Sequence, residues 1–131
     1  MNIETTALYT GLLGLLFWAL SARVMWWRFS TGVVVGDQDD PSKTGMIRAH
    51  ANFFEYVPIT LLMIALLELG EFASPWLHSL GAGLLVARLL HAVGMSRTPG
   101  VSLGRRVGTA LTMVVMGVAA LLCLGLAVDI I

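Results

Sequence analysis

Arg48, Asn52 and Glu55 are polar residues at the start of a run that is otherwise as apolar as lipid. Positions i, i+4 and i+7 fall on one face of a helix, so the three side chains form one polar stripe. Arginine binds a carboxylate through two parallel hydrogen bonds, and a glutamate accepts hydrogen bonds from an ammonium group. The stripe therefore matches a ligand that carries both carboxylates and an ammonium group.

Glu55 is the most costly member of this stripe. We expect it about two turns inside a membrane-spanning helix, where an ionised group costs on the order of 3 kcal/mol. It needs a counter-charge, for which Arg48 and Arg105 are the candidates. The alternative to a ligand site is an ion pair between helices that only fixes their packing.

Two further sets of residues, later in the chain, have similar helical spacing. They are Arg88, His91 and Met95 in one set, and Arg105, Thr109 and Thr112 in the other. We expect the three polar stripes to converge.

The composition indicates an integral membrane protein. The chain has 131 residues, of which 57% are hydrophobic and 12% charged, and its mean hydropathy is +0.84. Spanning a hydrocarbon core takes about 20 helical residues. Four segments qualify, at about 5–27, 43–70, 74–95 and 103–128. Short connectors predict an all-α, antiparallel four-helix bundle that forms a single domain over residues 1–131.

Charge is predicted to separate along this bundle. All basic residues fall near one end: Arg23, Arg28, Lys43, Arg48, Arg88, Arg97, Arg105 and Arg106. The other end carries Glu4, Glu68, Glu71 and Asp129. Basic residues beside membrane spans stay in the cytoplasm, so we expect both termini outside it. The simplest role for this basic end is topological, with contacts to anionic lipid head groups.

The second predicted helix also resembles a known family signature. Its residues Arg48, His50, Asn52, Glu55, Tyr56 and Pro58 are similar to the pattern of the membrane-associated proteins in eicosanoid and glutathione metabolism (MAPEG). The likeness covers nearly the whole chain and includes residues 20–23, Arg88 with His91, and Arg105 followed by Gly108 and Thr109.

This resemblance implies a homotrimer in the lipid bilayer, with glutathione bound between neighbouring subunits at the cytoplasmic end. The residues that match glutathione contacts are Arg23, Arg48, His50, Asn52, Glu55, Tyr56, Arg88 and His91. Arg105 resembles the catalytic arginine that stabilises the glutathione thiolate, and its spacing from Gly108 favours it over Arg106. A nearby cation lowers the pKa of a thiol and so increases the population of the nucleophile. The implied activity is a glutathione transferase or peroxidase acting on lipophilic small molecules.

The sequence departs from the eicosanoid enzymes at four positions. Val24 and Ala51 stand where those enzymes carry a second arginine, while His91 and Met95 occupy positions that resemble third-helix tyrosines. These differences favour a small bacterial-type member, for which the bacterial inner membrane is the expected location.

Other functions have weaker support. Residues 36–40 resemble the start of a calcium loop, but its twelfth position is Arg48 instead of a glutamate, so we predict no metal site. A solvated loop that leads into the second helix, with Ser42 as its N-cap, fits better. His50 and His91 are weak evidence for haem, no internal repeat suggests a transporter, and no nucleic-acid partner is expected. The remaining alternative is a non-catalytic membrane protein whose polar stripe serves assembly or binds another anionic ligand.

Overall fold

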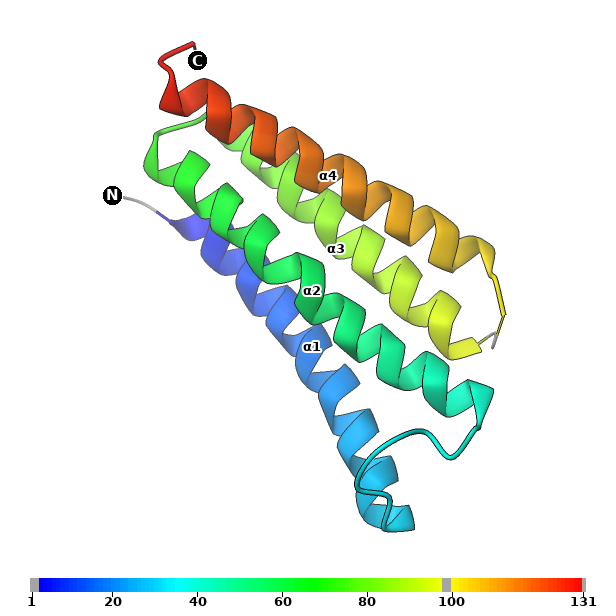
Figure 1. Cartoon of the computed structure of the whole chain (residues 1–131). Helices are drawn as coiled ribbons and strands as arrows, with labels where there is room; N and C mark the ends of the chain where they lie inside the picture. Colours follow the sequence, from blue (N-terminus) through cyan, green and yellow to red (C-terminus); the bar gives the residue numbers. More distant parts are fainter. Residues whose placement is uncertain (1–2, 98–99, 131) are drawn as a thin grey trace.

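The computed structural model describes residues 3–97 and 100–130, and in this part of the chain all regular secondary structure is helical. The helices are α1 (Glu4–Thr31), α2 (Pro41–Leu69), α3 (Ser74–Arg97) and α4 (Leu103–Ala127) (Figure 1). All four are long and apolar enough to cross a bilayer, as the sequence predicts. The first helix continues four residues beyond its predicted end at residue 27.

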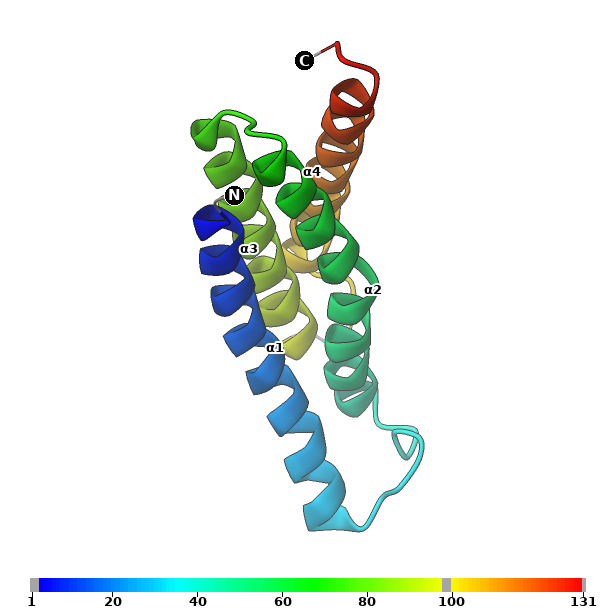
Figure 2. The ribbon, with the colours of Figure 1, turned by 90° about the vertical axis from the view of Figure 1, so that its left-hand side faces the viewer.

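Helix α3 is the centre of the bundle. Half of its most apolar stretch is buried, against 17% for α1 and for α4. Helices α1 and α4 lie on opposite sides of the molecule and do not contact each other within the described residues (Figures 1 and 2). Each outer helix therefore leaves a long apolar face for lipid or for another protein chain.

Three glycines let α3 and α4 approach closely at the end away from the termini: Gly94, Gly104 and Gly108. A Cβ atom at Gly108 would lie 2.6 Å from both the carbonyl oxygen of Ala87 and the backbone nitrogen of His91. Both neighbours are backbone atoms, which cannot rotate away. Close contact between helix backbones thus fixes α4 against the part of α3 that carries His91.

The opposite end of the bundle is held by Glu68. Its two carboxylate oxygens accept hydrogen bonds from the backbone nitrogens of Thr5 and Thr6, at 2.8 and 2.7 Å. The first residues of a helix have free N–H groups and a partial positive charge, which a carboxylate satisfies. The N-cap residue of α1, Ile3, makes no capping hydrogen bond with its side chain. Glu68, near the end of α2, caps α1 instead.

The α1–α2 connection, residues 32–40, lies at the end away from the termini (Figure 1). Helix α1 ends at Gly32, whose φ of 72° is left-handed, and Arg28 donates a 2.7 Å hydrogen bond to the carbonyl oxygen of Val34. The predicted N-cap of α2 is wrong. Asp40 caps the helix by accepting from the backbone nitrogen of Ser42, because Pro41 needs no partner in the first turn.

Candidate functional site

Arg88 is the most deeply buried charged side chain among the described residues, with 1% of its surface exposed. Its Nη2 donates to Oδ1 of Asn52 at 2.9 Å and also lies 2.9 Å from Nδ1 of His91. A guanidinium group only donates, so Nδ1 of His91 accepts and the histidine is neutral, with its proton on Nε2. These contacts join the stripe of α2 to that of α3, as the sequence predicts.

Arg88 is not fully satisfied by this network. Its Nε and Nη1 atoms are buried and have no hydrogen-bond partner in the described part of the chain. The guanidinium carbon lies 5.7 Å from the centre of the Phe53 ring, a cation–π contact that stabilises the charge only partly. Buried donors without partners cost free energy. Arg88 is therefore a cation with hydrogen-bonding capacity left for another group.

Arg48 and Arg105 lie on one recess of about 350 Å³ at the same end of the bundle. The recess lies where the N-terminal parts of α2 and α4 meet the loop before α2. Its lining residues are Asp37, Asp39, Pro41, Thr44, Gly45, Arg48, Met95 and Arg105. Both arginines are exposed, and neither guanidinium group makes a hydrogen bond or ion pair with any described residue. Arg106, which is also exposed, does not line this recess.

Glu55 lies at the middle of α2. Its side chain is exposed, and its Oε2 accepts a 3.4 Å hydrogen bond from Nδ2 of Asn52. No described residue forms an ion pair with it, so the expected partners Arg48 and Arg105 are not its counter-charge. Glu55 and the half-buried Tyr56 instead lie close enough to act electrostatically on Arg88. The stripe thus faces outward, with Asn52 between Arg88 and Glu55.

His50 and Arg23 lie apart from this group. His50 points toward α1, where its Nε2 is 3.0 Å from Oγ of Ser21 and its ring stacks on Phe17 at 4.9 Å between centres. Arg23 donates a hydrogen bond to the hydroxyl of Ser96 at the end of α3. The structure gives both residues contacts within the subunit that join α1 to its neighbours.

The three residues of the expected stripe on α4 differ in their exposure. Arg105 and Thr109 are exposed, whereas Thr112 is 1% exposed and donates to the carbonyl oxygen of Gly108 in its own helix. The close approach of the two helices at Gly108 turns the Thr112 side of α4 toward α3. His91 and Met95, by contrast, are both buried on α3.

An apolar groove of about 490 Å³ runs between α1 and α2. Its walls include Leu13, Phe17, Phe53 and Leu62. Phe53 also underlies Arg88, so the groove and the buried cation share one wall. A lipophilic molecule in this groove would reach the polar network without leaving apolar surroundings.

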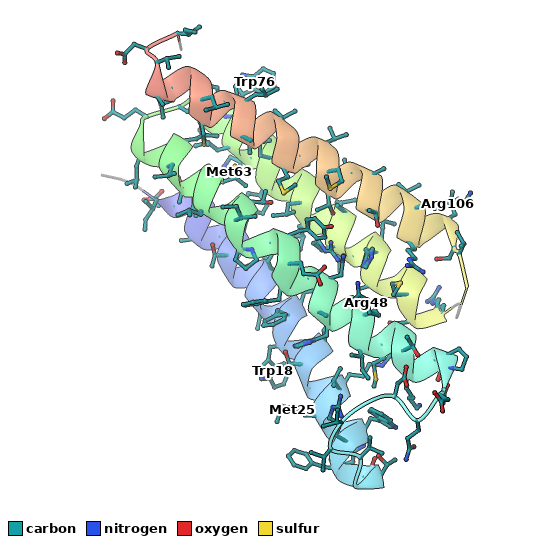
Figure 3. All side chains as sticks on the ribbon, in the orientation of Figure 1. Trp18, Met25, Arg48, Met63, Trp76 and Arg106 are labelled. Carbon is teal, nitrogen blue, oxygen red and sulfur yellow. The ribbon has the colours of Figure 1, made fainter. Side chains whose placement is uncertain are left out.

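The opposite end holds a larger recess, of about 650 Å³, which includes Glu68, Glu71 and His78. The carboxylate of Glu68 is already occupied by the start of α1. Figure 3 shows both ends of the bundle. Arg48 and Arg106 lie in the half away from the termini, and Trp76 lies in the half that holds the termini. Within residues 3–97 and 100–130, no group of three or more histidine, cysteine, aspartate or glutamate side chains is suited to a metal.

The sequence did not indicate that loop residues help to line the recess of Arg48 and Arg105, called the arginine recess below. Asp37 and Asp39 were assigned to a solvated loop, yet they face the same space as Arg48 and Arg105. The hydroxyl of Thr44 and the backbone nitrogen of Asp39 donate to Asp37 and hold the pKa of its carboxyl below its usual range. The run of acids directly before α2 was the available signal, since it lies about two turns from Arg48.

Comparison with known proteins agrees with this arrangement. The MAPEG family model matches residues 6–125, which is nearly the whole chain and reaches from the first turn of α1 to the last turn of α4. This chain belongs to the MAPEG family. It is also 33% identical over 89 residues to the inner membrane protein YecN of Escherichia coli strain K12, covering 68% of each chain. YecN of E. coli O6:H1 strain CFT073 gives the same values. The resemblance inferred from the α2 signature is confirmed, and these relatives support an integral membrane protein.

Proposed function

We propose that this MAPEG member is a glutathione-dependent transferase or peroxidase that acts on lipophilic electrophiles or hydroperoxides. Glutathione would lie at the basic end, against the polar wall formed by Arg48, Asn52, Glu55 and Tyr56. Arg105 would stabilise its thiolate for attack on a molecule arriving from the bilayer. Glutathione is the co-substrate in this proposal, and no metal takes part.

The observation that carries the proposal is the buried Arg88 with two unpartnered nitrogens. It holds Oδ1 of Asn52, so the amide nitrogen of Asn52 faces outward toward Glu55. A charge that served packing alone would be expected to have its donors satisfied within the fold. The network instead presents an organised polar surface beside the two unpaired arginines of the recess.

The apolar groove supports a lipophilic second substrate. It lies between α1 and α2, and Phe53 connects its wall to Arg88. A substrate that enters this groove from the bilayer would thus be held close to the thiol of glutathione. Holding the two reactants together lowers the entropic cost of their reaction.

A homotrimer completes this proposal. The exposed position of Glu55 on an apolar helix needs either water or another polar surface beside it. The unpartnered faces of α1 and α4 offer the area for neighbouring subunits. Arg23, His50 and His91 would then support the site from within each subunit.

The decisive measurement is glutathione binding and turnover by the purified protein in detergent. We expect calorimetric binding of glutathione, together with conjugation of chlorodinitrobenzene or reduction of cumene hydroperoxide. Arg105→Ala should lower kcat by about a hundredfold and reduce the ultraviolet absorbance of bound thiolate. Arg106→Ala is the matched control, because this adjacent exposed arginine does not line the recess. Absence of both binding and turnover in the wild type would refute the proposal.

Glu55→Gln distinguishes the enzyme from a non-catalytic membrane protein that uses the stripe for assembly. An intact oligomer with weakened glutathione binding supports the site. Dissociation of the oligomer in detergent, with unchanged binding per subunit, supports the assembly role. Size-exclusion chromatography with light scattering, followed by calorimetry on the same sample, gives both results.

A further inference from the structure

Helix α1 reaches further than the other helices at the end away from the termini (Figure 2). Its 28 residues rise about 42 Å, whereas the hydrocarbon core of a bilayer is about 30 Å thick. At the other end, Glu68 ties the start of α1 to the end of α2. The last two turns of α1, from about Met25 onward, therefore extend into the head-group region of the bilayer.

This projecting segment carries large apolar side chains that the rest of the described chain does not cover. Trp26 and Phe29 of α1 are 77% and 80% exposed. In the loop that follows, Val34 and Val35 are 84% and 85% exposed. Aromatic side chains favour the boundary between lipid tails and water, and apolar surface left in water costs free energy. We therefore expect the segment to lie against lipid.

The same segment encloses a hollow of about 350 Å³ that has a single charged residue in its wall. The wall is formed by Met25, Arg28, Phe29, Gly32, Val33 and Val34. The loop holds Arg28 in place, because Nη1 donates to the carbonyl oxygens of Val33 and Val34. Its guanidinium carbon also lies 5.5 Å from the centre of the Trp27 ring. Nε and Nη2 of Arg28 make no hydrogen bond or ion pair with any described residue, so this fixed cation still has donors available.

From this arrangement we propose that the hollow binds an anionic phospholipid. Nε and Nη2 of a guanidinium group point the same way and can bind two oxygens of one phosphate. The apolar wall, which includes Phe29 and Val34, would contact the upper part of an acyl chain. Bound lipid would thus anchor the α1–α2 loop at the membrane surface.

The composition of the hollow favours a lipid with a net negative charge. None of the described residues in its wall is acidic, in contrast to the arginine recess, whose wall includes Asp37 and Asp39. A zwitterionic head group would bring an ammonium group that has no acidic partner here. The sequence predicts contacts with anionic lipid for the basic end as a whole, and the structure assigns one such contact to Arg28.

The test is native mass spectrometry of the full chain, titrated in detergent with phosphatidylglycerol or with phosphatidylcholine of the same acyl chains. We expect the wild type to bind the first phosphatidylglycerol about fivefold more tightly, which is the effect of one basic side chain beside anionic lipid. Arg28→Gln should remove this preference, and Arg28→Lys, which keeps the charge, should retain part of it. Phe29→Ser should weaken the binding of both lipids alike, because it changes the apolar wall.

Arg97→Gln is the matched control, because Arg97 is an exposed arginine at the same end that does not line the hollow. It should keep the preference. Equal binding of the two lipids by the wild type, or an equal loss of preference in Arg97→Gln and Arg28→Gln, would refute the site. Displacement of the lipid by excess inorganic phosphate would also overturn it, since the hollow would then be a site for free anions. If Phe29→Ser dissociates the oligomer and leaves lipid binding unchanged, the hollow is a contact between subunits and the proposal fails.

Discussion

The two ends of the bundle use their charged residues differently. At the end that holds the termini, the carboxylate of Glu68 is satisfied by two backbone nitrogens of α1. At the other end, Arg88 keeps two buried nitrogens without partners, and the guanidinium groups of Arg48 and Arg105 make no hydrogen bond or ion pair with described residues. Glu68 therefore supports the fold at one end, whereas Arg48, Arg88 and Arg105 keep donors available at the other, where Arg23 and Arg28 join segments of the fold.

This difference indicates where a ligand acts. A polar group that folding has satisfied contributes to stability, whereas an unsatisfied one reduces stability unless something binds it. The recess that includes Glu68 is larger than the recess lined by Arg48 and Arg105, yet the Glu68 carboxylate already accepts two hydrogen bonds. Availability of hydrogen-bonding groups is thus a better guide to the site than volume.

The largest effect is expected from the packing that holds the basic end together. Gly108→Ala places a Cβ atom 2.6 Å from backbone atoms of α3 and should lower the free energy of unfolding by about 2 kcal/mol through overpacking. Thermal unfolding in detergent measures this change. Gly117→Ala on the same helix meets nothing within 4 Å and should be neutral or slightly stabilising. Equal losses in both variants would show that close helix contact is not the cause.

Arg88→Met tests whether charge at the basic end serves binding. The change removes two unpaired buried donors, so we expect the free energy of unfolding to change by less than about 1 kcal/mol. Glutathione binding should weaken about tenfold, since Asn52 loses the contact that orients its amide. Arg97→Met, at the exposed end of α3, is the control for calorimetry. A large loss of stability in Arg88→Met but not in Arg97→Met would show that Arg88 stabilises the fold, and would contradict the proposed difference between the two ends.

Glu68→Gln is the reciprocal test at the end that holds the termini. The amide keeps one acceptor and turns a donor toward the start of α1, which should cost about 1 kcal/mol, as for other helix caps. Hydrogen exchange at the first turn of α1 should accelerate, while glutathione binding is unchanged. Glu71→Gln is the neighbouring exposed control. Weakened binding in Glu68→Gln would contradict the division of roles.

The smallest effect concerns the loop beside the recess. Thr44→Val removes the hydroxyl that contributes most to lowering the pKa of Asp37, so this pKa should rise toward its ordinary value of 3.8. A lowered folded pKa stabilises the loop above the ordinary pKa, and that contribution is lost as the pH falls through the folded value. The wild type should therefore be slightly the more stable at neutral pH, and the difference should disappear as the pH falls below about 4. Carbon NMR of the Asp37 carboxyl follows the titration, and an unchanged curve would exclude Thr44 as the cause.

Much of this protein could be predicted from the sequence because the relevant signals are local. Four apolar runs, each long enough to span a bilayer, give four helices, and helical spacing brings Arg48, Asn52 and Glu55 onto one face. Helical spacing also relates Arg88 to His91, three residues apart, and their hydrogen bond follows. The expected trimer and glutathione site stay predictions, since they concern partners outside the chain.

Other features depended on contacts between segments. Spacing within α4 could not show that Gly108 turns Thr112 toward α3, nor spacing within α2 that Glu55 would be left without Arg48 or Arg105. The cap on α1 comes from Glu68, more than sixty residues away, and a search for local caps cannot find it.

The sequence by itself determined the membrane class, the number of helices and the gathering of basic residues at one end of the bundle. These features can be read from hydropathy and charge along single helices. Only the tertiary structure decided which charged side chains form hydrogen bonds within the fold and which keep groups available for a ligand. That outcome depends on the approach of α3 to α4 and of the loop to α2. Hydrogen bonds and ion pairs act over a few ångströms, a distance that sequence spacing does not fix between separate helices.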